Sequence, residues 1–311
     1  MLQSSVFGLR STVLQLPHSR RRLTLAVLLL ALSAFGSLLR AQQASSQPAA
    51  PPPRLVKVAD DLYVIQNVNH TVAEIGQNGG NVSIIVTSDG VILVDSKFER
   101  MHDDIMAKVK SITDKPVRYM VLTHNHGDHS GGSARLQAMG VTVVSSVASR
   151  ENMARANAPG RAQVAYSGYS ELTLGGTRLE LREFRGHTRG DTVVSLPARR
   201  AVIAGDLVTT PDSIPAIVNY ADGGSWTELG ESLEAIARMD FDLLIGGHGP
   251  NLTKAELLKF RDKAAGIRER FRALNREKKS QDEIAQTLVK EFNWGSGPAA
   301  GNLAGMMQEL R

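Results

Sequence analysis

The sequence of 311 residues contains no cysteine. This absence excludes disulfide bonds, cysteine ligands to a metal and lipid attachment through a cysteine. A charge imbalance is also missing from most of the chain. The formal net charge is +5, and residues 1–41 contain five arginines and no acidic residue, so the remaining residues sum to zero. A neutral body of this kind gives no argument for binding nucleic acid.

The N-terminal segment has the pattern of an export signal. Ser19–Arg22 is basic, Leu23–Leu39 is a run of 17 uncharged residues, and Ala41 is a small residue suited to cleavage. We therefore expect a signal peptide at 1–41 and a periplasmic or secreted protein that has no stable membrane association once the signal is cleaved. The arginine run resembles a twin-arginine signal. The alternative is an uncleaved anchor, because 17 residues just suffice to span a membrane.

The remaining chain divides by composition. Residues 42–54 form a Pro/Ala-rich linker that cannot bury a core. We expect one domain at 55–250, followed by a helical extension at 251–311 that packs on the same domain. Capping patterns predict two long helices in that extension, Ala255–Asn275 and Gln281–Phe292.

Hydrophobic runs predict two strand hairpins and several single strands. Val82–Thr87 and Val91–Asp95 flank a Ser-Asp-Gly turn, and a second hairpin ends at Phe184. The early strands come in hairpins, whereas those in the middle alternate with helical patterns. An α/β fold with two sheets covered by helices is therefore favoured over a single parallel sheet.

Three histidines and an aspartate lie within six residues directly after a hydrophobic strand. They are His124, His126, Asp128 and His129, with Gly127 among them. Nitrogen and oxygen ligands of these types suit zinc. Burying four such polar groups together without compensation would be costly, so the cluster predicts a metal site.

Three more ligand-type residues occur in glycine-rich contexts at other strand ends. His187 follows Leu179–Phe184, Asp206 follows Ala201–Ala204, and His248 follows a short strand that ends at Ile245. Strand ends can converge on one place, and glycine lets the backbone turn sharply there. Seven ligands exceed the needs of one ion, so we expect two ions with one carboxylate between them.

Taken in order, Thr-His-x-His-x-Asp-His, Gly-His-Thr-x-Gly-Asp, Gly-Asp and Gly-His-Gly resemble the metallo-β-lactamase superfamily over about residues 55–250. The resemblance implies a four-layer αβ/βα sandwich with the metals at one edge. It also implies that His124, His126 and His187 hold a first zinc, and that Asp128, His129 and His248 hold a second, with Asp206 bridging them.

The chain departs from the familiar β-lactamases at Asp206. Two subclasses have a cysteine at this position, and the third usually lacks the bridging aspartate. In this respect the chain is more similar to the superfamily's lactone and thioester hydrolases. We therefore expect a binuclear zinc hydrolase that attacks a lactam, lactone or thioester carbonyl of a small molecule with a metal-bound hydroxide. Asp128 and Asp206 are the expected catalytic residues, and iron or manganese would also suit the ligands.

Two alternatives stay open at this point. The first is an oxidoreductase, a mononuclear-iron sulfur dioxygenase that uses only some of these ligands. The second is a non-catalytic exported metal-binding protein. Flavin-linked diiron members have a glutamate in place of one motif histidine, and His126 argues against that reading.

Residues around the ligands carry weaker expectations. Asp95 and Asp191 are candidates for hydrogen bonding the second ring nitrogen of a metal-binding histidine. The segments 67–80 and 209–224 are expected to be loops near the metals, with Tyr220, Tyr166, Tyr169 and Trp226 as available aromatic residues.

Overall fold

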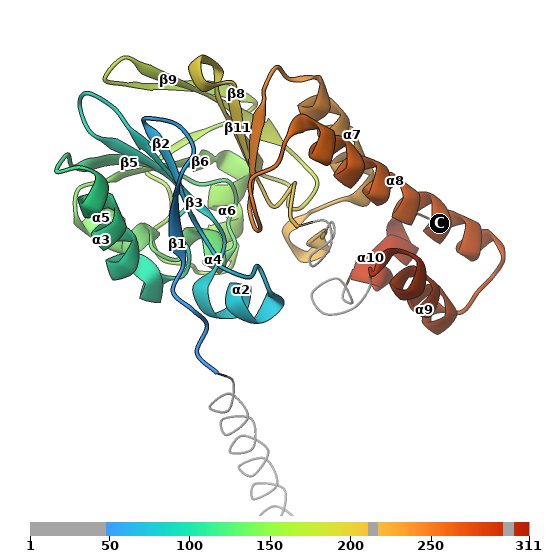
Figure 1. The fold of residues 1–311 in the computed structure, drawn as a ribbon. Helices are drawn as coiled ribbons and strands as arrows, with labels where there is room; N and C mark the ends of the chain where they lie inside the picture. The colour runs from blue at the N-terminus through green and yellow to red at the C-terminus, as the bar shows by residue number, and fades with distance from the viewer. Residues whose placement is uncertain (1–47, 211–216, 295–301, 311) are drawn as a thin grey trace, which may run out of the picture. The chain divides into compact units, whose positions relative to one another are not determined.

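The computed structural model describes residues 48–210, 217–294 and 302–310 (Figure 1). The expected signal peptide at 1–41 lies outside this part of the chain. Within the described ranges, none of the helices combines the length and apolar character needed to cross a bilayer.

Two β-sheets form the centre of the fold. The first has seven strands in the order β1-β2-β3-β4-β5-β6-β7, and the second has five in the order β12-β11-β10-β9-β8. Strands β1 to β4 pair antiparallel, and β4 to β7 pair parallel. In the second sheet only β11 and β12 are parallel. The strands are β1 Arg54–Lys57, β2 Leu62–Gln66, β3 Val82–Val86, β4 Val91–Val94, β5 Val117–Val121, β6 Thr142–Ser146, β7 Val164–Tyr166, β8 Tyr169–Leu174, β9 Thr177–Phe184, β10 Asp191–Leu196, β11 Ala201–Gly205 and β12 Leu243–Gly246.

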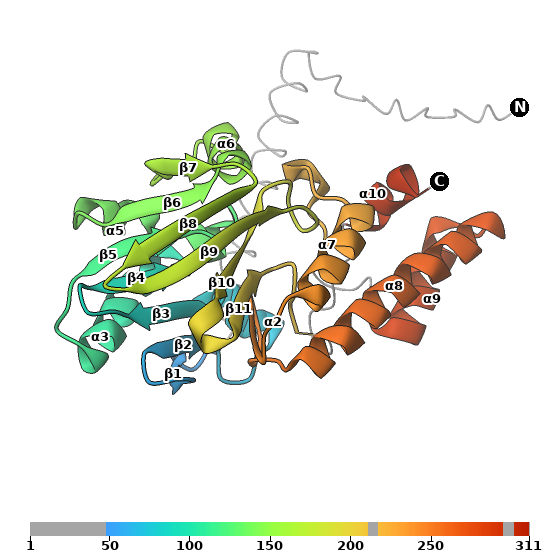
Figure 2. The same ribbon diagram turned by 90° about the horizontal axis from the view of Figure 1, so that it is seen from above.

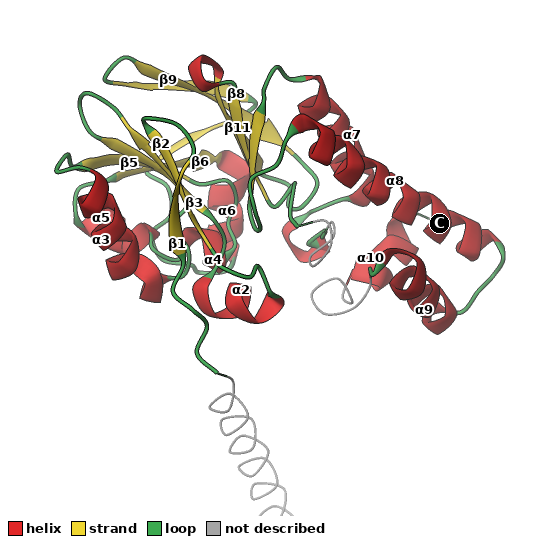
Figure 3. Ribbon diagram, viewed as in Figure 1, coloured by secondary structure: helices red, strands yellow, loops and turns green. Residues whose placement is uncertain are grey.

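Helices cover the outer face of each sheet, as Figure 3 shows in red against the yellow strands. Figure 2 shows α3, α5 and α6 on one side, with α7 and α8 on the other. The helices are α2 Val72–Asn78, η1 Glu99–Met101, α3 His102–Ile112, α4 Gly127–Ser130, α5 Ser133–Ala138, α6 Val147–Arg155, η2 Pro197–Arg199, η3 Tyr220–Asp222, α7 Trp226–Arg238, α8 Lys254–Arg276, α9 Gln281–Phe292 and α10 Asn302–Glu309.

Neighbouring residues of the central strands enter different cores because side chains alternate across a sheet. Ile85 packs between the two sheets, whereas Ile84 packs under the helices on the outer face of the first sheet. In the second sheet, Ile203 faces the space between the sheets and Val202 faces α7 and α8. Strands buried on both faces read as continuous hydrophobic runs. The result is the expected four-layer αβ/βα sandwich, which is thus confirmed.

The C-terminal helices extend the outer layer beside the second sheet. Helix α8 contributes Phe260, Ile267 and Phe271 to the same core as α7. The capping box of Thr253 and Glu256, which predicted the start of this helix, is formed. This end of the chain therefore shares one hydrophobic core with the second sheet.

Four α-helices were not expected from the sequence: α2, α4, α6 and α10. A local signal for α2 was present, because Thr71 and Glu74 form a complete capping box in what was expected to be a loop. The residue range expected to be a linker also contacts this helix: the Ala50 amide donates to Gln77 Oε1, 2.8 Å away.

Candidate metal centre

All seven ligand-type residues lie where strands of the two sheets end at one edge of the sandwich. His124 follows β5, and His126 caps α4, which carries Asp128 and His129. The other three follow strands of the second sheet. They are His187 between β9 and β10, Asp206 after β11 and His248 after β12. Two sheets therefore bring these ligand-type residues to a common place from opposite sides.

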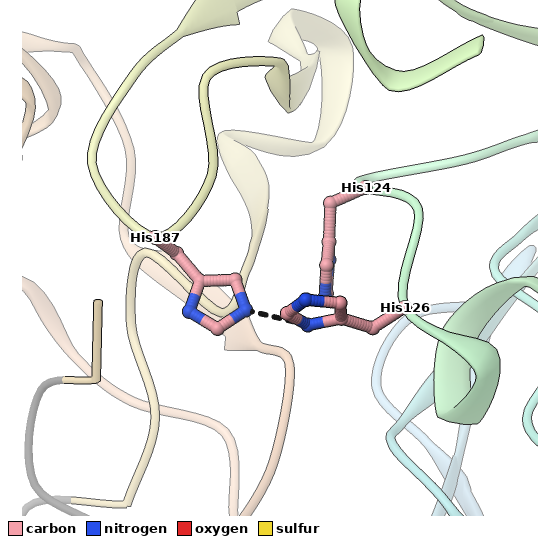
Figure 4. Close-up of side chains that lie close together, drawn as sticks. All are labelled: His124, His126 and His187. Carbon is pink, nitrogen blue, oxygen red and sulfur yellow. Dashed lines mark hydrogen bonds between the residues drawn. The ribbon is translucent and has the colours of Figure 1, made fainter. Parts of the chain in front are cut away.

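His124, His126 and His187 form the first group that could hold a metal ion (Figure 4). The Nδ1 atom of His126 lies 2.9 Å from Nε2 of His187. The three ring centroids are 4.7 to 4.8 Å apart, and the planes are nearly perpendicular. Rings at these angles can direct three nitrogen lone pairs at one point, as a tetrahedral metal requires.

Asp128, His129 and His248 form a second such group. Asp128 Oδ2 lies 3.5 Å from His129 Nε2 and 3.4 Å from His248 Nε2. The two imidazole nitrogens are 3.3 Å apart. One carboxylate and two imidazoles again match the ligand types that zinc prefers.

Asp206 lies between the two groups. Its Oδ1 is 3.3 Å from His129 Nε2, and its Oδ2 is 3.3 Å from His248 Nε2 and 3.7 Å from His187 Nε2. Its side chain therefore contacts histidines of both groups. This is the position that a bridging carboxylate needs.

Hydrogen bonds on the outer side of three rings turn their other nitrogen toward the centre. The Nδ1 atom of His187 donates to the Ile217 carbonyl oxygen at 2.9 Å. His129 Nδ1 lies 2.9 Å from Asp95 Oδ2. The Thr123 hydroxyl donates to the same carboxylate and can accept from His124 Nδ1 at 3.1 Å. The tautomer of each ring is thereby set for metal binding through Nε2.

The protonation states in the group of His124, His126 and His187 fit metal binding. His124 is fully buried, and its Nε2 has no hydrogen-bond partner among the described residues. Burial, together with the nearby His129 and His187, holds the pKa of His124 well below its usual range. Burial likewise lowers the pKa of His187 to about 4. Both imidazoles are therefore neutral at physiological pH, and the neutral form is the one that binds metals.

The second group is charged differently in the metal-free protein. Burial opposes protonation of His129, but the carboxylates of Asp128 and Asp206 outweigh it and raise the pKa of His129 well above its usual range. Burial also opposes ionisation of Asp206, yet His248 and His129 hold the pKa of that carboxyl well below its usual range. A cation entering here displaces a proton, because a ligating imidazole must be neutral.

Asp95, one of the two sequence candidates for supporting a histidine, does contact one. Its carboxylate bonds His129 directly and His124 through Thr123, so one residue orients a ring in each group. Asp95 has a φ of +66°, a strained conformation for a residue with a side chain. Asp191, the other candidate, accepts instead from the Thr188 amide and hydroxyl and so shapes the turn that carries His187.

Sequence reasoning missed the residues that support His126. The Nε2 atom of its ring lies 3.0 Å from Asp222 Oδ2 and 2.7 Å from Asn219 Nδ2. Asn125 also donates to Asp222, at 2.9 Å. Asp222 is 96 residues from His126 in the chain. No local pattern could have connected them.

A buried lysine beneath the site was also missed. Lys97 has no exposed surface, and its ammonium donates to the Gly80 carbonyl oxygen at 2.5 Å. Burial lowers the pKa of Lys97 to about 7. A Cβ on Gly80 would lie 2.2 Å from His129 Cε1, so the turn that the lysine holds fits closely against a ligand ring.

A cavity of about 570 Å³ opens beside the ligand groups. Helix α2 and the segment 217–221 supply much of its lining, so parts of both segments expected near the metals do lie there, whereas residues 211–216 lie outside the described residues. Tyr220 lines it, whereas Trp226 is buried in the core and Tyr166 bonds Thr192. Tyr169 is exposed on β8. The apolar and amide side chains that line the cavity include Val72, Ile75, Phe98, Ile217, Tyr220 and Asn302.

We expect the two supporting aspartates to differ in a zinc titration of the metal-free protein. Asp95→Asn should weaken both sites by about 10- to 100-fold, because Asp95 orients a ring in each group. Asp222→Asn should weaken only the site of His124, His126 and His187, by a similar factor. Competition with a chromophoric chelator measures both constants. Asp103→Asn, an exposed carboxylate paired with Arg135, is the control. Equal losses in the two variants would contradict this division.

The chain is similar to known proteins both in sequence and in fold. A family model described as the Metallo-beta-lactamase superfamily matches residues 75–248. The chain is 26% identical over 242 residues to a metallo-beta-lactamase type 2 of Bacillus cereus, covering 73% of this chain and 91% of that protein. It is 31% identical over 148 residues to a hydroxyacylglutathione hydrolase of Anaeromyxobacter dehalogenans, covering 46% and 53%.

The solved structures that resemble the chain in fold include metallo-beta-lactamases as well. A metallo-beta-lactamase of Pseudomonas aeruginosa in a mono-zinc form superposes with a TM-score of 0.60 at 26% identity, covering 71% of this chain and 98% of that one. A metallo-beta-lactamase of Pontibacter korlensis gives 0.59 at 22% identity, covering 68% and 99%. The latter likeness concerns the fold alone.

Proposed function

Because the chain belongs to the metallo-beta-lactamase superfamily and is a metal-dependent hydrolase, we propose that it uses two zinc ions to hydrolyse a lactam, lactone or thioester. One observation carries this proposal. Two groups of three ligands meet at Asp206, whose carboxylate lies within 3.7 Å of histidines from both. A cavity large enough for a small molecule adjoins them.

Each ligand-type residue has a proposed role in holding the two ions. His124, His126 and His187 would hold one ion, Asp128, His129 and His248 the other, and Asp206 both. Zinc bound there supplies an activated water near neutral pH and a Lewis acid for the substrate carbonyl. Asp128 reaches the cavity wall and can orient the attacking water through its carboxylate. The buried positions of His124 and His129 exclude bulk water from the opposite side.

The cavity favours a small carbonyl substrate over a phosphodiester of nucleic acid. No lysine or arginine occurs among the described residues that line it. The segment 209–224 contains Asp212 and Asp222 and no basic residue. Enzymes that bind nucleic acid normally meet its phosphates with basic side chains. Apolar walls from α2 and from Ile217 and Tyr220 suit the uncharged part of a small ester, thioester or amide.

Within the carbonyl class, two kinds of similarity point to different substrates. The Bacillus relatives are named as metallo-beta-lactamases, and the Anaeromyxobacter relative is named for a hydroxyacylglutathione. The aspartate at position 206 and the absence of cysteine favour the ester and thioester side. We therefore place lactones and thioesters ahead of lactams.

The test is metal analysis of the purified protein followed by a comparison of kcat/KM. The substrates are a chromogenic cephalosporin, an acyl lactone, a thioester and an activated phosphodiester. We expect two zinc ions per chain, loss of activity on chelation, and at least one carbonyl substrate preferred over the phosphodiester by about 100-fold or more. One bound iron without hydrolysis would support the dioxygenase instead. A clear preference for the phosphodiester would refute the argument from charge.

A further inference from the structure

The C-terminal helix α10 contacts the metal-bearing edge, although it lies beyond the residues 75–248 that the family model matches. Glu309 is the centre of these contacts. One carboxylate oxygen accepts from the Ser225 hydroxyl at 2.7 Å and the Thr227 amide at 2.9 Å. The other accepts from the Trp226 amide at 2.9 Å and the Tyr220 hydroxyl at 2.8 Å. A carboxylate thus meets free amides at the first turn of α7, where the helix dipole favours negative charge.

The start of α10 holds the same region from a second point. Asn302 is buried, and its side-chain oxygen accepts from the Val218 amide at 2.6 Å. Between the two contacts, the helix packs tightly on the Tyr220 ring. A Cβ on Gly305 would lie 2.1 Å from Tyr220 Cδ2 and 2.6 Å from its Cγ. Only glycine allows the helix to approach the ring this closely.

The region held in this way, residues 217–225, supports two of the proposed ligands. Its Ile217 carbonyl accepts from His187, and its Asp222 and Asn219 side chains contact His126. The backbone amide of Asn219 also donates to the backbone carbonyl oxygen of His187 at 2.7 Å. Any shift of residues 217–225 would therefore move the outer partners of both rings.

We propose that α10 is a positioning element of the metal site, with Glu309 as its principal residue. It holds residues 217–225 against His126 and His187, so the ion bound by His124, His126 and His187 depends on the last helix of the chain. Although partial burial opposes ionisation, the donors from Ser225, Thr227, Trp226 and Tyr220 hold the pKa of Glu309 at about 2. The Glu309 carboxylate therefore stays charged at neutral pH.

A purely structural role is the competing explanation, because Leu303 and Met306 of α10 are buried in the core beside the second sheet. The two explanations differ in what Glu309 should change. A packing helix would affect the stability of the fold. A positioning helix would change the zinc affinity of one site. The inference rests on the proposed metal centre, so its test includes a measurement that needs no metal.

The test uses the full chain with Glu309→Gln and Glu309→Ala, and zinc alone as the probe. We expect the site of His124, His126 and His187 to bind zinc about 10-fold more weakly in Glu309→Gln and up to about 100-fold more weakly in Glu309→Ala. The other site should change much less. In the metal-free variants, hydrogen exchange of residues 217–227 should be faster. Glu291→Gln is the control, since Glu291 pairs with Arg270 between α8 and α9.

Gly305→Ala gives a second test at the contact between α10 and Tyr220. If α10 only packs, the added methyl group should lower the stability of the fold, because it clashes with the Tyr220 ring, and leave the zinc affinity unchanged. We expect instead weaker zinc binding at the first site, because the added methyl group drives the helix and the Tyr220 ring apart. Gly266→Ala in α8, whose nearest contact would be 3.2 Å from Phe292 Cε1, is the matched control.

The outcomes separate the two proposals. A wild-type protein that binds no zinc would overturn the proposed function, and the exchange of residues 217–227 would still report on α10. Zinc affinities equal to wild type in both Glu309 variants and in Gly305→Ala, with only a lower melting temperature, would overturn the positioning role and leave the proposed function intact.

Discussion

Replacing Asp206 by alanine is expected to lower kcat/KM by on the order of 1000-fold and to leave about one zinc ion per chain. The carboxylate contacts histidines of both ligand groups, at 3.3 Å from His129 and His248 and 3.7 Å from His187. Without it, the first group keeps three histidines, whereas the second keeps Asp128 and two histidines but loses its link to the first. We therefore expect the second ion to be lost first.

The fold should survive this change. Asp206 follows β11, and the three hydrophobic cores are formed by other residues. Elemental analysis, activity and thermal unfolding of the metal-free variant are the measurements. Asp206→Asn, which keeps the shape and removes the charge, separates the two properties. Two bound metals with full activity in Asp206→Ala would contradict a bridging role.

The substitution Gly247→Ala is expected to impair the site nearly as strongly, although all seven ligands remain. An added Cβ would lie 1.9 Å from Asp206 Oδ1 and 2.8 Å from the Gly205 carbonyl carbon. The backbone cannot retreat easily, because the Gly247 amide donates to Gly205 and Val208 at 2.8 and 3.0 Å. The carboxylate must move instead. We expect a loss of activity of about 100-fold or more, with a cost in stability of about 1–3 kcal/mol.

The control for Gly247→Ala lies in the first motif. A Cβ on Gly127 would meet nothing within 4 Å, although this residue stands between two proposed ligands. Gly127→Ala should therefore keep its zinc content near that of the wild type. The comparison is made by elemental analysis and by zinc titration of the metal-free proteins. If Gly247→Ala binds two zinc ions as tightly as wild type, Asp206 has more freedom than this geometry allows.

Predictions from the sequence were accurate where the cause was local. The hairpin around Ser88-Asp89-Gly90 formed as β3 and β4, and the capping box at Thr253 starts α8. These properties depend on neighbours within a few residues of the chain. They were sufficient for the layer architecture.

Helices α2 and α10 were not predicted from the sequence, for two different reasons. For α2 the capping box of Thr71 and Glu74 was present, but the polar residues around it favoured a loop. For α10 the decisive contacts are distant: Glu309 bonds Tyr220 across 89 residues, and Asn302 bonds Val218 across 84. A segment of eight residues stabilised by such contacts has little helical preference of its own.

The sequence by itself determined which residues have ligand-type side chains and that the segments carrying them follow strands, because residue type and strand pattern are local properties. The tertiary structure alone decided their partners. It brought Asp206 between two groups of histidines, turned Asp95 toward rings of both groups, and placed Asp222 against His126. Those contacts arise where two sheets and a distant helix pack together. Packing at that edge depends on the whole core, which no short stretch of sequence specifies.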